Sequence, residues 1–207
     1  PLRRQRQMCI RDSYWVHNGF VTMNKEKMSK SLGNITTIEE ATKKYSGQVV
    51  RLSLLSAQYK QPLDWNNNLL IEQSKTLNKW YSMYSSEVSE KIPDCFNDLL
   101  DEMNTPLYIS KLHEMFNQAQ KGDSEKKKEF NKACRLIGLF YETNEKRAEY
   151  KKSKVKISED IILNKIKDRD NAKKKGDYKL ADKIREDLIK EGIDIKDEKG
   201  KTTWNYK

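Results

Sequence analysis

The spacing of apolar side chains predicts a chain built mostly of helices. Apolar residues recur at three-, four- and seven-residue steps over 70–88, again over 109–119, and again over 130–141. These steps place apolar side chains on one face of a helix. Asn104-Thr105-Pro106 is typical of a helix start, because capping side chains precede a proline that needs no N–H partner. The stretch 66–144 therefore predicts an antiparallel helical bundle.

The chain ahead of this bundle has two kinds of pattern. Aromatic and turn-forming residues over 14–23, which read YWVHNGFVTM, predict a short strand and a turn. The stretch 36–59 becomes helical behind the capping residue Thr37, and Pro62 ends it. Residues 1–13 have no periodicity, so we interpret them as a foreign or disordered tail.

The end of the chain alternates between helix and strand. A lysine-rich link over 151–156 precedes a helix that Ser158 caps, and a second helix is closed by Gly192. Ile193-Asp194-Ile195 and Thr202-Thr203-Trp204 flank a turn and predict a β-hairpin. Two helices followed by a hairpin predict a small α+β domain.

Composition and charge narrow the classes of function. The chain has 207 residues, of which 36% are apolar and 35% charged, so several small packed units are favoured over one large core. A formal net charge of +10 favours a partner that carries phosphates. No apolar run approaches the roughly 18 residues of a membrane span. We therefore expect no membrane partner. The three cysteines form no CxxC arrangement, so we also expect no disulfide framework and a cytoplasmic location.

The stretch 25–34 reads KEKMSKSLGN and has almost no apolar periodicity. Two lysines, Lys27 and Lys30, stand three positions apart beside two serines, and a glycine follows. A flexible loop of this kind suits a polyphosphate, because it offers ammonium groups and backbone N–H donors to growing negative charge. A solvated basic turn is the alternative for an arbitrary pair of lysines. The intact order KMSKS followed by LGN favours the phosphate loop.

This signature resembles the KMSKS loop of class I aminoacyl-tRNA synthetases, and the surrounding text resembles the cysteinyl-tRNA synthetases. The second resemblance rests on YWVHNGF, RLSLLSAQYKQPLDW, MNTPLYISKLHEMF and AKKKGDYKLADKIREDLIKEGIDIKDEKGKTTW, in that order over 14–207. It implies a mainly α fold of three parts. These are the end of a class I, Rossmann-type catalytic domain over 14–65, an antiparallel helical bundle over 66–150, and a small α+β anticodon-binding domain over 151–207.

The resemblance also implies an activity. In the family, cysteine is activated with ATP and Mg²⁺ and is then transferred to tRNA(Cys), and the KMSKS loop closes over ATP to stabilise the transition state of adenylation. Lys27 and Lys30 are therefore the candidate catalytic residues, and Lys27, Met28, Ser29, Lys30 and Ser31 are the candidate ATP-binding residues, with Met28 near the adenine. The implied partners are tRNA(Cys), ATP and cysteine, and we expect a monomer.

A second implied site lies in the last domain, which in the family reads the anticodon by stacking and by contacts to base edges. Lys173 stands where the family has a basic residue, usually arginine, whose planar fork lysine lacks. Tyr178 stands at an aromatic position, and Asp182 and Asp197 keep two acidic positions. Without the resemblance, Tyr178 and Trp204 would be interpreted as core residues and the charges as solvated.

Two features of the family are missing from this sequence. These are the HIGH-type ATP motif and the zinc site that selects the cysteine thiolate, so we expect a C-terminal fragment that is inactive alone and holds no metal. His17 stands alone, and His113 falls on the polar side of a helix. One alternative is a stand-alone RNA-binding helical module derived from a synthetase, in which KMSKS is a relic. The other is a structural helical protein without a ligand.

Overall fold

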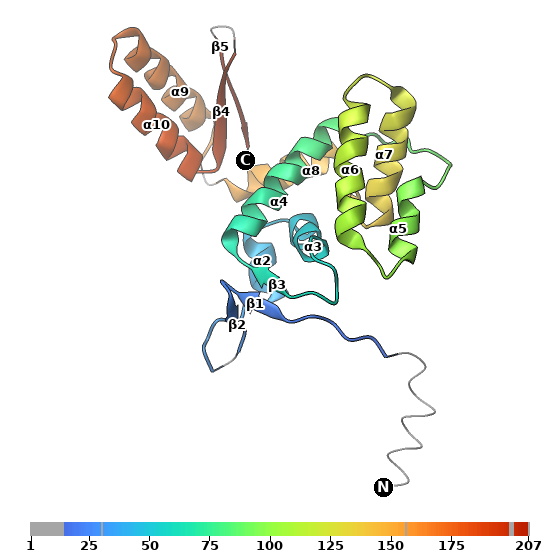
Figure 1. Cartoon of the computed structure of the whole chain (residues 1–207). Coiled ribbons are helices and arrows are strands. Elements are labelled where there is room, and N and C mark those ends of the chain that lie inside the picture. Colours follow the sequence, from blue (N-terminus) through green and yellow to red (C-terminus); the bar gives the residue numbers. More distant parts are fainter. Residues whose placement is uncertain (1–14, 30, 156, 199–200, 207) are drawn as a thin grey trace, which may run out of the picture. The chain divides into compact units, whose positions relative to one another are not determined.

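The computed structural model describes residues 15–29, 31–155, 157–198 and 201–206 (Figure 1). It divides the chain into two compact units, of which the first ends at Tyr141 and the second begins at Glu142. Each unit combines helices with one small sheet, so the mainly α fold predicted from the sequence is confirmed. Within the described ranges, no helix is long and apolar enough to cross a membrane.

The first unit begins with a three-stranded sheet in the order β2-β1-β3. Strand β1 (Val21–Met23) pairs antiparallel with β2 (Glu26–Lys27) and parallel with β3 (Leu63–Trp65). A parallel pair needs a crossover connection, which α2 (Ile38–Lys44) and α3 (Gly47–Leu55) supply. Parallel strands joined through helices are the arrangement expected at the end of a Rossmann-type sheet.

The helical stretch predicted over 36–59 is two helices. Thr37 caps α2 reciprocally with Glu40: the Glu40 N–H donates to Thr37 Oγ1 at 3.2 Å, and the Thr37 N–H donates to the Glu40 carboxylate at 2.9 Å. Ser46 then starts α3, because its hydroxyl accepts from the Val49 N–H. A second capping serine within the stretch was the local signal for the break.

The rest of the first unit is the helical bundle. Its elements are α4 (Asn67–Trp80), the short 3-10 helices η1 (Tyr81–Met83) and η2 (Asp94–Phe96), α5 (Asn97–Leu100), α6 (Thr105–Ala119) and α7 (Ser124–Leu136). Helix α6 starts as predicted, with Asn104 accepting from the Leu107 N–H at 3.2 Å. A short loop joins α6 to α7, which makes them antiparallel neighbours.

The helical spacing predicted to run from Leu70 to Val88 stops at Trp80. The buried side chain of Asn131 on α7 accepts from the Ser85 N–H at 2.8 Å and donates to the Met83 carbonyl at 2.8 Å. These bonds satisfy backbone groups that a longer α4 would have paired with itself. Because Asn131 lies 46 residues beyond Ser85, the local pattern does not reveal the end of the helix.

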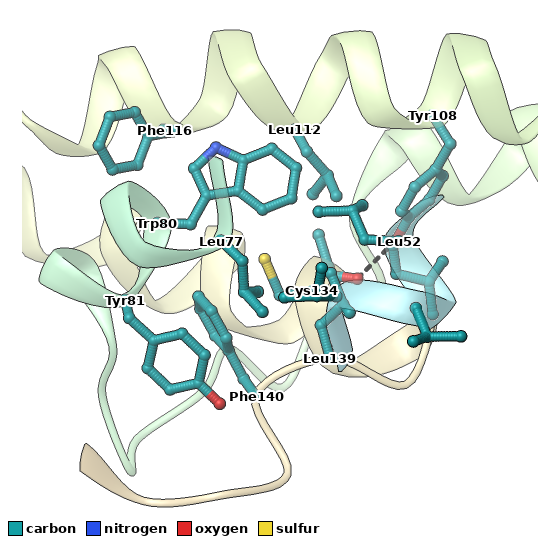
Figure 2. Packing of buried hydrophobic residues seen from close by; sticks show 14 of the residues in the cluster. Leu52, Leu77, Trp80, Tyr81, Tyr108, Leu112, Phe116, Cys134, Leu139 and Phe140 are labelled. Atoms are coloured by element: carbon teal, nitrogen blue, oxygen red, sulfur yellow. Dashed lines mark hydrogen bonds between the residues drawn. The ribbon is translucent and has the colours of Figure 1, made fainter. Parts of the chain in front are cut away.

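One apolar core holds the first unit together (Figure 2). Its fully buried side chains come from α3, α4, α6 and α7 and from the segment after α7, and they include Leu52, Leu77, Trp80, Tyr108, Leu112, Phe116, Phe130, Cys134, Leu139 and Phe140. Leu52 belongs to the predicted catalytic part and Trp80 to the predicted bundle. The boundary predicted between residues 65 and 66 therefore does not separate two packed units.

The second unit consists of α8 (Asn144–Lys154), α9 (Glu159–Lys174), α10 (Tyr178–Lys190), β4 (Ile193–Glu198) and β5 (Lys201–Tyr206). Strands β4 and β5 pair antiparallel as predicted, with Ile195 opposite Trp204. Ile193 and Ile195 pack with Ile162 and Leu188 from the two helices, which makes a separate small core. The hairpin thus closes one side of the α9–α10 pair.

The lysine-rich link predicted over 151–156 is helical as far as Lys154. Helix α8 begins behind Thr143, whose hydroxyl accepts from the Lys146 N–H at 3.3 Å. The break between the units therefore falls ahead of α8 and not between residues 150 and 151, which lie inside this helix. Seven of the eleven residues of α8 are charged, and these charges hid its periodicity.

We expect Lys151→Met to stabilise the second unit at pH 7. Burial and the nearby Arg147 lower the pKa of Lys151 to about 8, from an ordinary value of 10.5. Below pH 8 the folded state carries a poorly solvated ammonium, and between pH 8 and 10.5 the unfolded state binds more protons, so stability rises with pH across this window.

Thermal unfolding at pH 7 and pH 10 measures the effect. The midpoint of Lys151→Met should exceed that of the unmodified chain by a few degrees at pH 7 and match it at pH 10. The exposed Lys174→Met is the control, and an equal gain there would contradict the prediction.

Candidate functional site

The β1–β2 hairpin carries the candidate phosphate loop. Its turn residues Asn24 and Lys25 have φ angles of 51° and 68°, as a tight two-residue hairpin turn requires. Asp64 on β3 fixes this turn, because its Oδ1 accepts from the Lys25 N–H at 2.6 Å and from the Thr22 hydroxyl at 3.0 Å. The hydrogen bond from the Lys25 backbone holds the pKa of Asp64 below its ordinary value. The sheet thereby fixes the backbone of Lys27, which pairs with Thr22 and is exposed.

The side chain of Asn34 closes the loop. Its Nδ2 donates to the Lys27 carbonyl at 3.2 Å, and its Oδ1 accepts from the Ser29 N–H at 2.9 Å. The Ser29 hydroxyl in turn accepts from the Leu32 N–H at 3.3 Å. Gly33 has a φ of 64°, a conformation that favours glycine and returns the chain toward Asn34. Sequence reasoning gave Asn34 no role, although an asparagine after a glycine is a turn signal.

The closed loop limits what the motif offers a phosphate. The N–H groups of Ser29 and Leu32 already have acceptors, so this conformation presents the side chain of Lys27 instead of those two donors. The Ser31 hydroxyl lies 3.2 Å from that of Ser29. Lys30, the second predicted catalytic lysine, lies outside the described residues.

An open cavity of about 570 Å³ lies beside the loop. Its lining comes from β1, α2, β3 and the start of α4 and includes Lys43 and Lys44. None of the described motif residues in 27–31 lines it, and Met28, which follows β2 directly, is half-buried. The cavity and the motif are therefore neighbouring features of the first unit and not one pocket.

In the second unit, two of the predicted anticodon residues meet. Lys173 Nζ lies 2.8 Å from Asp197 Oδ2. Arg169 donates to both oxygens of the same carboxylate, at 3.0 and 2.8 Å, and the Thr202 hydroxyl donates to Oδ1 at 3.0 Å. The hydrogen bonds from Arg169 and then Lys173 hold the pKa of Asp197 far below its ordinary value. Asp197 is therefore an ionised acceptor at neutral pH.

Sequence reasoning missed Arg169, which is only 2% exposed. The signal was its place on α9, seven positions after Ile162 and three after Ile166, which puts it on the buried face of the helix. The hydrogen bond with Asp197, followed by the charges of Asp170 and Asp182, raises the pKa of Arg169. The buried guanidinium of Arg169 thus joins α9 to the carboxylate of Asp197 on β4.

The other two predicted residues lie on α10. Asp177 caps this helix, Tyr178 is its first residue and is 68% exposed, and Asp182 is exposed one turn later on the same face. The alternative that Tyr178 is a core residue is therefore wrong. Trp204 instead packs partly buried against the small core, edge-on to Tyr206.

The two histidines lie apart from any group of possible metal ligands among the described residues. In the part of the chain that the structure describes, no three His, Cys, Asp or Glu side chains are grouped to hold a metal ion. His17 is exposed. His113 lies edge-on to Trp80, with 4.9 Å between ring centroids, and partial burial lowers its pKa. His113 is nevertheless exposed, as predicted for the polar side of its helix.

Residues 5–76 match the family described as tRNA synthetases class I (C) catalytic domain. Part of the stretch 1–13, which we predicted to be a tail, therefore aligns with that family. A cysteine-tRNA ligase from Pelagibacter ubique shares 44% sequence identity with this chain over an alignment that covers 96% of it. The corresponding ligase from Rickettsia bellii shares 39% identity over 92% of the chain, and the one from Afipia carboxidovorans shares 36% identity over 93%. The chain is a sequence relative of the cysteine-tRNA ligases. This agrees with the resemblance seen in the sequence.

The chain spans less than half the length of the cysteine-tRNA ligases that it matches, at 46%, 43% and 42% of these three relatives. A solved LeuRS-tRNA-LeuAMS ternary complex from Agrobacterium radiobacter K84 resembles 58% of the chain with a TM-score of 0.44 and 19% identity. That likeness is too distant to carry an argument. The relation to cysteine-tRNA ligases therefore rests on sequence, along nearly the whole chain.

Proposed function

We propose that this chain is the part of a cysteine-tRNA ligase that supplies the KMSKS loop to the ATP site and recognises the anticodon of tRNA(Cys). The observation that carries the proposal is 44% identity to such a ligase along 96% of the chain, with Lys27, the first residue of the KMSKS motif, exposed at the end of β2. The substrates would be cysteine, ATP and tRNA(Cys), and the enzyme would act as a cytoplasmic monomer. The names of the relatives do not favour a stand-alone RNA-binding module.

In the ATP site, the Lys27 ammonium would meet the phosphates. The sheet and the Asn34 bridge fix its backbone, so the side chain can approach a nucleotide without reorganising the hairpin. Mg²⁺ would arrive on the ATP phosphates and neutralise part of their charge. The described residues do not fit the Zn²⁺ site of the family, because they group no three suitable ligands.

In the anticodon site, carboxylates suit the cysteine anticodon GCA. Each of its three bases carries an exocyclic amino group, and an ionised carboxylate accepts hydrogen bonds but donates none. Asp182 and Asp197 would take these amino groups, the exposed ring of Tyr178 would stack on a base, and Lys173 would approach a phosphate or base. Lysine supplies charge there without the planar fork of arginine.

The test is a binding comparison between two RNA hairpins, one with GCA in its loop and one with an altered anticodon, measured with the 207-residue chain at fixed salt. The unmodified chain should prefer GCA. Tyr178→Ala should weaken binding of the GCA hairpin by about 1–3 kcal/mol, the usual contribution of one base–aromatic stack. Leu180→Ala, which removes another exposed apolar side chain from α10, is the matched control. Equal affinity of the unmodified chain for both hairpins would contradict the proposed function.

A further inference from the structure

Asp197 has two kinds of hydrogen-bond partner. A carboxylate offers about four acceptor positions, and the described residues address four: Arg169 twice, Lys173 and Thr202 once each. Arg169 is buried, with a side chain 3% exposed, whereas the side chain of Lys173 is 36% exposed. One partner therefore lies beneath the carboxylate, and others lie nearer its open side.

The open-side partners can release Asp197 at little cost. The Thr202 hydroxyl has one hydrogen and lies 3.0 Å from both Asp170 Oδ1 and Asp197 Oδ1, so it donates to one of them at a time. Turning it toward Asp170 frees an acceptor position on Asp197 without moving a heavy atom. Lys173 is a flexible point charge that can exchange a carboxylate for a phosphate. Asp197 can therefore accept a new donor while Arg169 stays in place.

A contribution to stability alone does not explain why an arginine is buried at position 169. Its Nε has no partner among the described residues, although the atom is buried. A buried ion pair is weak evidence for stability, because desolvation of the charges offsets much of their attraction. Its two parallel hydrogen bonds do, however, fix the plane of the carboxylate, which a single lysine cannot do.

We propose that Arg169 is the positioning residue of the anticodon site: its buried fork fixes the plane of Asp197 so that the exposed carboxylate edge accepts the amino group of a base. This inference rests on the proposed function of the second unit. Arg169 does not touch the RNA itself. It determines which geometry of donor Asp197 accepts, and so contributes to discrimination between bases more than to affinity for RNA in general.

The experiment uses the 207-residue chain and the same two hairpins. Arg169→Lys keeps the charge and loses the fork, and it should reduce the ratio of affinities for the GCA and altered hairpins by about tenfold, the usual scale of one base-edge contact. Arg169→Met tests loss of the charge as well. Lys167→Met, at an exposed position of the same helix, should leave the ratio unchanged. A variant that is partly unfolded binds both RNAs less, so the ratio still reports positioning.

Coupling to Asp197 separates positioning from a structural role. If Arg169 acts through Asp197, Arg169→Lys should not change the ratio further once Asp197→Asn is present. An undiminished ratio in Arg169→Lys, or a further loss of equal size in the Asp197→Asn background, would overturn this inference while leaving the proposed function standing. An unmodified chain without a preference for GCA would overturn both.

Discussion

Replacing Lys27 by alanine is expected to slow cysteine adenylation by raising its activation free energy by about 2–4 kcal/mol. This is the loss seen when one preorganised donor to a transition-state charge is removed. The assay needs the part of a cysteine-tRNA ligase that this chain does not span. We would therefore join residues 14–207 to the amino-terminal half of the Pelagibacter ubique ligase. That ligase is chosen because it is 44% identical to this chain where the two align. Cysteine-dependent ATP–pyrophosphate exchange measures the reaction. We expect a loss of the same order for Lys30→Ala.

The loss should fall on the rate more than on cysteine binding. Lys27 would meet charge that builds on the phosphates in the transition state, and an interaction made only there lowers kcat and kcat/KM together. Lys25→Ala is the matched control, because it removes an equal charge from the same hairpin turn outside the motif. Unchanged exchange in Lys27→Ala, or an equal loss in Lys25→Ala, would show that the motif lysine has no special role.

Local patterns predicted the parts of the structure that local interactions determine. The cap at Thr37, the start of α6 behind Asn104 and the hairpin of β4 and β5 all depend on residues near one another in the sequence, and all are confirmed. In the same way, the order KMSKS pointed to a loop, and the loop is closed by Asn34 only a few residues later. Neighbours in sequence were enough in each case.

Distant partners explain what the sequence did not show. Helix α4 ends at Trp80 because Asn131 forms hydrogen bonds with the backbone of Met83 and Ser85. The sequence near residue 80 contains no signal for that contact. Arg169 stands among other charged residues of α9, and its importance depends on Asp197, 28 residues away. A pattern of apolar steps also assigns each helix a face, but it does not reveal that a charged residue on that face has a partner.

Phe130→Ala should have the largest effect on the stability of the first unit, about 3–5 kcal/mol, the usual range for removing a phenylalanine from a core. Phe130 on α7 is fully buried, and its ring lies edge-on to Trp80, Phe116 and Phe140 with centroids 5.9, 5.7 and 5.8 Å away. These rings come from α4, α6 and the segment after α7, so one truncation opens a cavity between all three. Edge-to-face pairs add about 0.5–1.5 kcal/mol each beyond their burial, which favours the upper part of the range.

Urea unfolding followed by tryptophan fluorescence measures this loss, since Trp80 touches the altered position. The control is Leu136→Ala on the same helix, where the side chain is 39% exposed and little cavity would form. We expect the control to lose less than half as much, because the exposed part of a side chain gains little by folding. Because the total stability of a domain is only about 5–15 kcal/mol, Phe130→Ala should leave the first unit near its unfolding threshold at 25 °C. Equal losses in the two variants would mean that the aromatic cluster is not the centre of this core.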